Sequence, residues 1–372
     1  MASIRENIQR VVIKCGTGIL TRGIGELDTE RIYHFCDQIA DLRRRNIDVI
    51  VVSSGSIGLG MGTLGLNARP TENIPLLQAC AAIGQSTLID TWRKGLDRHK
   101  IRGAQVLLTH DAVRERERHI NTRNMLDMLL SRGIVPIINE NDSVSAEEIK
   151  FGDNDVLSAL VASFTKADQL FILSTAPGLI DITGTGKVVP VVDEISKEIE
   201  GMAGTTASPT AVGGMISKIT AAGIATRSGC GVFIGSGRLD HILSLWFDTP
   251  LNPPEGTFFV PHGDAIGSRK RWIAFFEKPK GKVTVDAGAR EALVNKQSSL
   301  LAKGVTHVDG EFSINDVVEI IDSRGQPFAR GISQFSHIHL QQIAGLSTTD
   351  IQSIFPRRRR LEVVHRDTMV VL

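Results

Sequence analysis

Hydrophobic and polar positions along residues 10–246 follow the pattern of strand–helix–strand units. Short runs rich in Val and Ile begin near residues 10, 49, 103, 134, 169 and 231. Between them lie segments of helical periodicity, at residues 28–46, 74–97, 119–132, 153–164 and 238–246. Because the apolar runs are continuous rather than alternating, we expect strands covered on both faces. The pattern predicts an α/β fold with a mostly parallel sheet.

The pattern changes near residue 250, where proline and glycine become frequent. Beyond this point, short apolar runs closed by turns predict a small β-rich barrel with one or two helices. We therefore expect a first domain over residues 1–255, a linker over 256–278 and a second domain over 279–372.

Composition excludes several classes of protein. The 372 residues carry a net charge of +1, and only the last hundred are mildly basic, with four consecutive arginines at 357–360. The four cysteines show no metal-ligand or disulfide spacing. No apolar run has the length of a membrane span, and the N-terminus is too polar for a signal peptide. A cytoplasmic protein is expected, with no membrane contact.

Glycine-rich turns follow three of the predicted strands or precede their helices. The first carries Lys14, Gly16 and Thr17, the second Ser54 and Gly55, and the third precedes Lys218. Glycine lets a backbone approach an anion closely, and lysine adds a positive charge. Each turn alone equally fits an ordinary helix start, but three together favour an anionic substrate. The Gly-x-Gly-x-x-Gly match at 60–65 follows no strand directly, so it does not predict a dinucleotide site.

The segment INENDSVSAEEIKFGDND, residues 138–155, is rich in carboxylates and carboxamides. Asp153, Asn154 and Asp155 stand immediately before a predicted helix, where they could cap it or belong to a site at the carboxyl edge of the sheet. Phosphoryl transfer needs cations and backbone N–H groups around the transferred group, and a carboxylate between two lysines would orient them.

Several motifs resemble, in order, those of the glutamate 5-kinase family of amino-acid kinases: VVIKCGTGIL, VVSSGSIGLG, LLQACAAIGQ, VPIINENDSVS, IKFGDNDVLSALVA and GGMISK. The resemblance spans about residues 10–250 and implies the three-layer sandwich of that family. The tail is similar to the PUA domain, an RNA-binding module in other settings.

The resemblance implies a role for individual residues. It makes Lys14, Lys218 and Asp155 catalytic, with Asp155 organising the two lysines. It places glutamate against Ser54, Gly55, Asp142, Asp153 and Asn154. It places ATP against Lys14, Gly16, Thr17, Ser174, Thr175, Val212, Gly213, Gly214, Met215, Ile216, Ser217 and Lys218. Metal ligands are not assigned.

The implied activity is ATP-dependent phosphorylation of the γ-carboxylate of L-glutamate, the first step of proline biosynthesis, with ATP and Mg²⁺ as cofactors. The resemblance also implies a homo-oligomer, a dimer or tetramer, with possible transfer of the product to glutamate-5-phosphate reductase and RNA as a possible ligand of the PUA domain. Two departures fall on the nucleotide side: Ser174 and Thr175 replace the usual Thr-Asp, and Ala211 and Val212 replace Gly-Thr.

Two alternatives remain open from the residues. A sister amino-acid kinase acting on another carboxylate would share the sheet and the lysines. An RNA-binding or regulatory protein on a weakened kinase scaffold would fit the basic tail and the altered nucleotide motif, although the arginine run has no interleaved aromatics for base stacking.

Overall fold

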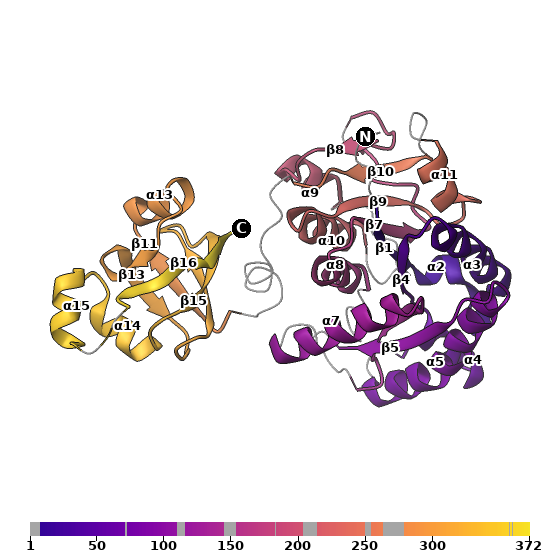
Figure 1. Ribbon diagram of the computed structural model, residues 1–372, viewed down its shortest axis with the longest axis horizontal. Helices are drawn as coiled ribbons and strands as arrows, with labels where there is room; N and C mark the ends of the chain where they lie inside the picture. The colour runs from indigo at the N-terminus through magenta and orange to yellow at the C-terminus, as the bar shows by residue number, and fades with distance from the viewer. Residues whose placement is uncertain are drawn as a thin grey trace. The chain divides into compact units, whose positions relative to one another are not determined.

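The computed structural model describes residues 8–70, 73–109, 116–144, 154–182, 184–203, 214–249, 254–262, 279–356, 358 and 360–372. The chain divides into two compact units (Figure 1), the first holding the elements from β1 to β10 and the second those from β11 to β16. Of the helices in these described ranges, none combines the length and apolar character that a bilayer crossing requires.

The first unit is built on an eight-stranded, mostly parallel sheet, as the sequence predicts. Its strands, in spatial order, are β5 (Gly103–Leu108), β6 (Val135–Glu140), β4 (Asp48–Val52), β1 (Arg10–Cys15), β7 (Gln169–Ser174), β9 (Gly231–Ser236), β10 (Gly256–Phe259) and β8 (Val191–Val192). The first six strands in this order, β5, β6, β4, β1, β7 and β9, pair in parallel with their neighbours, and β10 is antiparallel to β9. The carboxyl ends of β6, β4, β1, β7 and β9 therefore share one edge.

Helices cover both faces of this sheet and complete a three-layer sandwich (Figure 1). On one face, α8 (Asn154–Thr165) and α10 (Met215–Arg227) pack against each other over β1, β7 and β9. The opposite face carries α3 (Thr29–Arg44), α5 (Ile74–Asp97) and α11 (Ile242–Asp248). The remaining elements are α2 (Thr17–Leu20), α4 (Ser56–Thr63), α7 (Arg116–Ser131), α9 (Lys197–Ala203) and the hairpin of β2 (Thr21–Gly23) and β3 (Glu26–Leu27).

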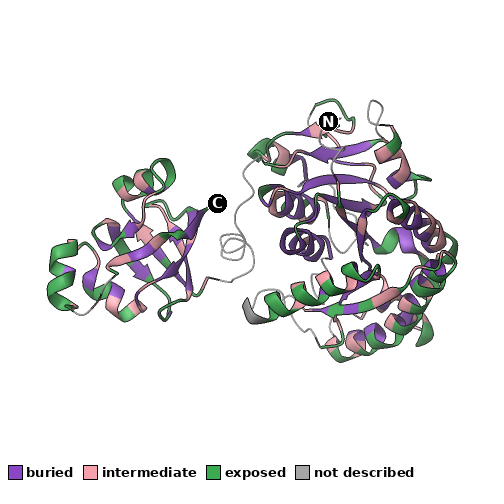
Figure 2. Ribbon diagram, in the orientation of Figure 1, coloured by how far each residue is buried: buried purple, intermediate pink, exposed green. Residues whose placement is uncertain are grey.

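Local sequence signals explain where these helices begin. The Asp28 side chain accepts a hydrogen bond from the Arg31 N–H at 3.1 Å and caps α3, and Asn73 caps α5 in the same way through Leu76. The central strands are continuously buried (Figure 2), since β1 and β7 are covered on both faces.

The junction differs from the expected boundaries. The predicted linker began at residue 256, but Gly256–Phe259 form β10 of the first sheet, so the first unit continues past residue 255. A four-residue strand within a proline- and glycine-rich stretch gives almost no periodic signal, because its alternation is too short to detect.

The second unit is β-rich, as predicted, with a hydrophobic core of its own. Its described residues form three α-helices, where one or two were expected. Its sheet has the order β12 (Leu300–Leu301), β16 (Glu362–Val371), β15 (Pro327–Ser333), β14 (Val317–Ile321), β11 (Gly281–Val285) and β13 (Val305–Asp309). The helical elements are α13 (Ala287–Asn295), the short 3₁₀ helix η3 (Ala302–Gly304), α14 (His337–Ile343) and α15 (Thr348–Ile354). A reciprocal pair of bonds between Ser347 and Asp350 caps α15.

Candidate active site

A buried carboxylate lies between two lysines at the carboxyl edge of the first sheet. Lys14 is the second-last residue of β1, Asp155 is in the first turn of α8, and Lys218 is in the first turn of α10. The Lys14 ammonium contacts Asp155 Oδ1, and Lys218 Nζ lies 2.9 Å from Asp155 Oδ2. All three side chains are buried, with Asp155 only 1% exposed. We call these three residues the charged cluster.

In the charged cluster, one carboxylate pairs with two ammonium groups. Burial by itself would raise the pKa of Asp155, but the neighbouring charges of Lys14 and Lys218 outweigh it and hold that pKa below its ordinary value. The carboxylate therefore stays ionised, and one negative charge faces two ammonium groups. The Ser217 hydroxyl also donates to Asp155 Oδ2 at 3.1 Å. Two buried ammonium groups at the carboxyl edge of the sheet suit an anionic ligand.

The predicted nucleotide side is assembled from two turns. Gly16 is buried and its N–H donates to the Leu173 carbonyl at 3.0 Å, while a Cβ at Gly16 would lie only 3.5 Å from Lys14 Nζ. A Cβ at Gly18 would meet the Thr175 methyl group at 3.0 Å. The turn after β1 thus packs tightly against the turn after β7, which brings Gly16 and Thr17 close to Ser174 and Thr175.

Only part of the third glycine-rich turn, which precedes Lys218, lies among the described residues. Gly214 is an exposed residue directly before α10, and Met215, Ile216 and Ser217 form its first turn with Lys218. Val212 and Gly213 lie outside the described residues, as do Asp153 and the departure at Ala211.

The predicted glutamate side surrounds the end of β4. The Asn154 Nδ2 atom donates to the Ser54 hydroxyl at 2.9 Å. Gly55 adopts φ +105°, a conformation that favours glycine, and starts α4. Asp142 lies beyond β6, where it lines a cavity of about 270 Å³ together with Gln85 and Glu140.

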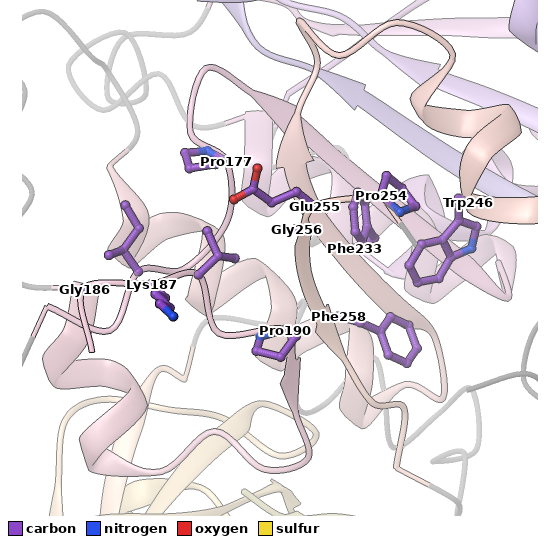
Figure 3. A pocket seen from close by; sticks show the side chains of 12 residues that line it. Pro177, Gly186, Lys187, Pro190, Phe233, Trp246, Pro254, Glu255, Gly256 and Phe258 are labelled. Carbon is purple, nitrogen blue, oxygen red and sulfur yellow. The ribbon is translucent and has the colours of Figure 1, made fainter. Parts of the chain in front are cut away.

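A larger cavity, of about 590 Å³, opens beside β9 and β10 (Figure 3). It is lined mainly by proline and aromatic side chains, among them Pro177, Phe233, Trp246 and Phe258. Every predicted site residue is absent from its described lining. Pro177 is nevertheless two residues from Thr175, within about 8 Å along the chain, so this cavity adjoins the nucleotide side.

Three polar residues near the site were not assigned from sequence. Asn139 and Glu140 lie at the end of β6 and are both buried, and Gln85 on α5 bonds to Asn139. All three fall inside the motifs INEND and LLQACAAIGQ, so the signal was present. Their convergence in space was not predictable, because Gln85 and Asn139 are 54 positions apart in the sequence.

Comparison with known proteins identifies the family of each unit. The family model described as the amino acid kinase family matches residues 9–236, and that of the PUA domain matches residues 281–355. A carbamate kinase from Giardia lamblia, bound to AMP-PNP, shares the fold at 16% identity, with a TM-score of 0.50 over 69% of this chain and 100% of its own. The chain belongs to the amino acid kinase family.

The curated relatives indicate which members of the amino acid kinase family this chain resembles. Glutamate 5-kinase of Trichlorobacter lovleyi is 41% identical over 99% of this chain and 98% of its own length. Glutamate 5-kinase of Acinetobacter baylyi is 40% identical, covering 98% of this chain and 96% of its own. Both units are therefore shared with these glutamate 5-kinases.

Proposed function

We propose that this chain transfers the γ-phosphoryl group of ATP to the γ-carboxylate of L-glutamate, giving L-glutamyl 5-phosphate, the first step of proline biosynthesis. The observation that carries the proposal is the charged cluster, in which Asp155 draws Lys14 and Lys218 from two separate elements to one point. The names of the relatives support glutamate as the acceptor.

The chemistry needs no general base. The γ-carboxylate of glutamate is already ionised near neutral pH, since its ordinary pKa is about 4. One of its oxygens forms the new bond to the γ-phosphorus while the bond to the bridging oxygen of ADP breaks, and ADP leaves with that electron pair. Lys14 and Lys218 stabilise the negative charge on the transferring group, and Asp155 keeps both ammonium groups in position.

The remaining predicted residues divide between the two ligands. Ser54, Asp142 and Asn154, with Gly55 and Asp153 beside them, hold glutamate. The turns at Gly16–Thr17, Ser174–Thr175 and residues 212–217 hold the nucleotide, with backbone N–H groups facing its phosphates.

Mg²⁺ enters the proposal as part of MgATP. Among the described residues, no three His, Cys, Asp or Glu side chains gather into a metal site. Asp155 is already engaged by two lysines. Mg²⁺ commonly keeps several waters and binds mainly through substrate phosphates, whose charge it neutralises.

The wider setting follows from the same family membership. We expect a homo-oligomeric cytoplasmic enzyme whose product passes to glutamate-5-phosphate reductase. RNA binding by the second unit is a separate expectation based on its PUA match.

ADP release, measured with glutamate, aspartate and N-acetylglutamate in parallel, tests the proposal. Turnover with glutamate well above the other two is the expected result. Turnover with another acceptor would indicate a sister kinase. Salt-dependent RNA binding in the absence of any ATP turnover would instead support the regulatory alternative.

A further inference from the structure

Three carboxamide side chains from three separate elements form a continuous hydrogen-bonded chain near the smaller cavity. Asn154 is the first residue of α8, Asn139 lies on β6 and Gln85 on α5. Asn154 Nδ2 donates to Asn139 Oδ1 at 3.0 Å, and Asn139 Nδ2 donates to Gln85 Oε1 at 2.7 Å. We call these three residues the carboxamide chain.

A backbone carbonyl fixes the orientation of the first member. Asn154 Nδ2 lies 2.8 Å from the Ser53 carbonyl oxygen, which can only accept a hydrogen bond. If the amide were flipped, two oxygens would face each other. Ser53 itself is held in place, because its buried hydroxyl accepts from Trp92 Nε1 at 3.0 Å. The Asn154 nitrogen therefore points toward β4 and β6.

The orientation of the Asn154 amide determines the orientations of the other two amides in the carboxamide chain. Because Asn154 presents its nitrogen, Asn139 must present its oxygen to it, and the Asn139 nitrogen turns toward Gln85 and the Ser56 hydroxyl, 3.3 Å away. Gln85 must then accept through its oxygen. The Gln85 nitrogen is consequently directed away from Asn139.

The two ends of the carboxamide chain differ in character. At one end, Asn154 Oδ1 is buried and accepts no hydrogen bond from any residue that the structure describes. At the other, Gln85 is half-buried and lines the 270 Å³ cavity beside Glu140 and Asp142. Within the described part of the chain, Gln85 bonds through its oxygen alone, which leaves two N–H groups for a ligand.

We infer that Gln85 is a specificity-determining residue whose Nε2 atom donates to the α-carboxylate of the amino-acid substrate. The inference rests on the proposed function and on the placement of glutamate between Asn154 and Asp142. Glu140 and Asp142 line the same cavity and suit the α-ammonium group of the substrate. The neutral amide of Gln85 is then the hydrogen-bond donor for the α-carboxylate. A hydrogen bond from a neutral amide to a carboxylate is charge-assisted and strong enough to set affinity.

The test replaces Gln85 with methionine, which has similar length and no polar hydrogen. For Gln85→Met we expect the KM for glutamate to rise at least about 10-fold, with kcat and the KM for ATP within about twofold, because Gln85 contacts neither the reacting atoms nor the nucleotide. The inhibition constant of 4-aminobutyrate, which is glutamate without its α-carboxylate, should stay unchanged. The inhibition constant of glutarate, which keeps both carboxylates, should rise in parallel with the KM for glutamate.

Two further variants separate binding from folding. Gln85→Glu still accepts from Asn139 but presents a negative charge instead of a donor, so it should raise the KM for glutamate more than Gln85→Met does. Gln341→Met, the same substitution at an exposed position of α14 and outside both cavities, should leave the KM for glutamate and the melting temperature unchanged.

The outcomes distinguish the two proposals. A wild-type chain that releases no ADP with glutamate contradicts the proposed function. An active wild type together with a Gln85→Met variant of unchanged KM for glutamate contradicts this inference alone. Equal weakening of glutamate and 4-aminobutyrate also contradicts it, because that result would show a general distortion of the cavity.

Discussion

The charged cluster and the carboxamide chain lie in adjoining parts of one site. Both contain buried polar groups, but these groups are paired in different ways. In the charged cluster, a single carboxylate pairs with two ammonium groups. In the carboxamide chain, the amides pair with one another and with the Ser53 carbonyl, and among the described residues Asn154 Oδ1 and Gln85 Nε2 are left for a ligand. The first arrangement suits stabilising a charge that moves during reaction, whereas the second suits reading the shape and polarity of a substrate.

Removing the central carboxylate should have the largest effect. Asp155→Asn removes the carboxylate that pairs with two buried ammonium groups, so the free energy of unfolding should fall by about 3–5 kcal/mol. Urea unfolding measures this loss. The matched control is Asp90→Asn, whose partner Lys94 is exposed, and it should change stability by less than about 1 kcal/mol. Equal losses in the two variants would show that the charged cluster has no special role.

Removing one cation should affect rate more than folding. Lys218→Ala deletes a group that stabilises the transferring phosphoryl charge, so kcat should fall by about 10²- to 10³-fold or more. Steady-state ADP release measures turnover, and circular dichroism checks that the fold is kept. Lys94→Ala, on the surface of α5, should be fully active. Near-normal turnover of Lys218→Ala would refute the catalytic role of Lys218.

Acid should reduce the stability that the charged cluster contributes, and it should not affect the carboxamide chain, whose amides do not titrate. The pKa of Asp155 is lower in the folded protein than in the unfolded chain. Its contribution to stability is therefore complete above the ordinary carboxyl pKa of about 4 and is lost as pH falls through the lowered value. The stability difference between wild type and Asp155→Asn, followed by urea unfolding, should be constant from pH 8 to about 5. A difference that already fades near pH 6 would contradict this.

The smallest expected effect concerns the Ser217 hydroxyl, which donates a hydrogen bond to Asp155 of the charged cluster. Ser217→Ala removes a hydrogen bond to Asp155 of the kind usually worth about 1 kcal/mol, so kcat should fall about fivefold. Because Ser217 is half-buried, stability should barely change. Ser353→Ala in α15 serves as the control, and its kcat should equal that of the wild type. No change in kcat for Ser217→Ala would place its hydroxyl outside the working site.

Sequence periodicity was enough to predict the strands that carry the site, because buried parallel strands are read as continuous apolar runs. The glycine-rich turns and the acidic segment indicated both lysines and Asp155, and the family resemblance implied that Asp155 organises the lysines. The individual contacts came from the structure, because α8 and α10 become neighbours only on folding. Periodicity missed β10, which is too short to show a period. The carboxamide chain was out of reach for another reason: the orientation of an amide depends on its neighbours, and Asn139 and Gln85 become neighbours only after folding.

Cys15 follows Lys14 directly in the chain, which makes it an obvious target for thiol-reactive compounds directed at the site. Burial raises the pKa of this thiol to about 12, against a smaller opposing influence of the Lys14 charge. The thiolate is the reactive form, so alkylating agents and mild oxidants should spare Cys15 at neutral pH. Covalent inhibitors of this protein therefore need a different anchor.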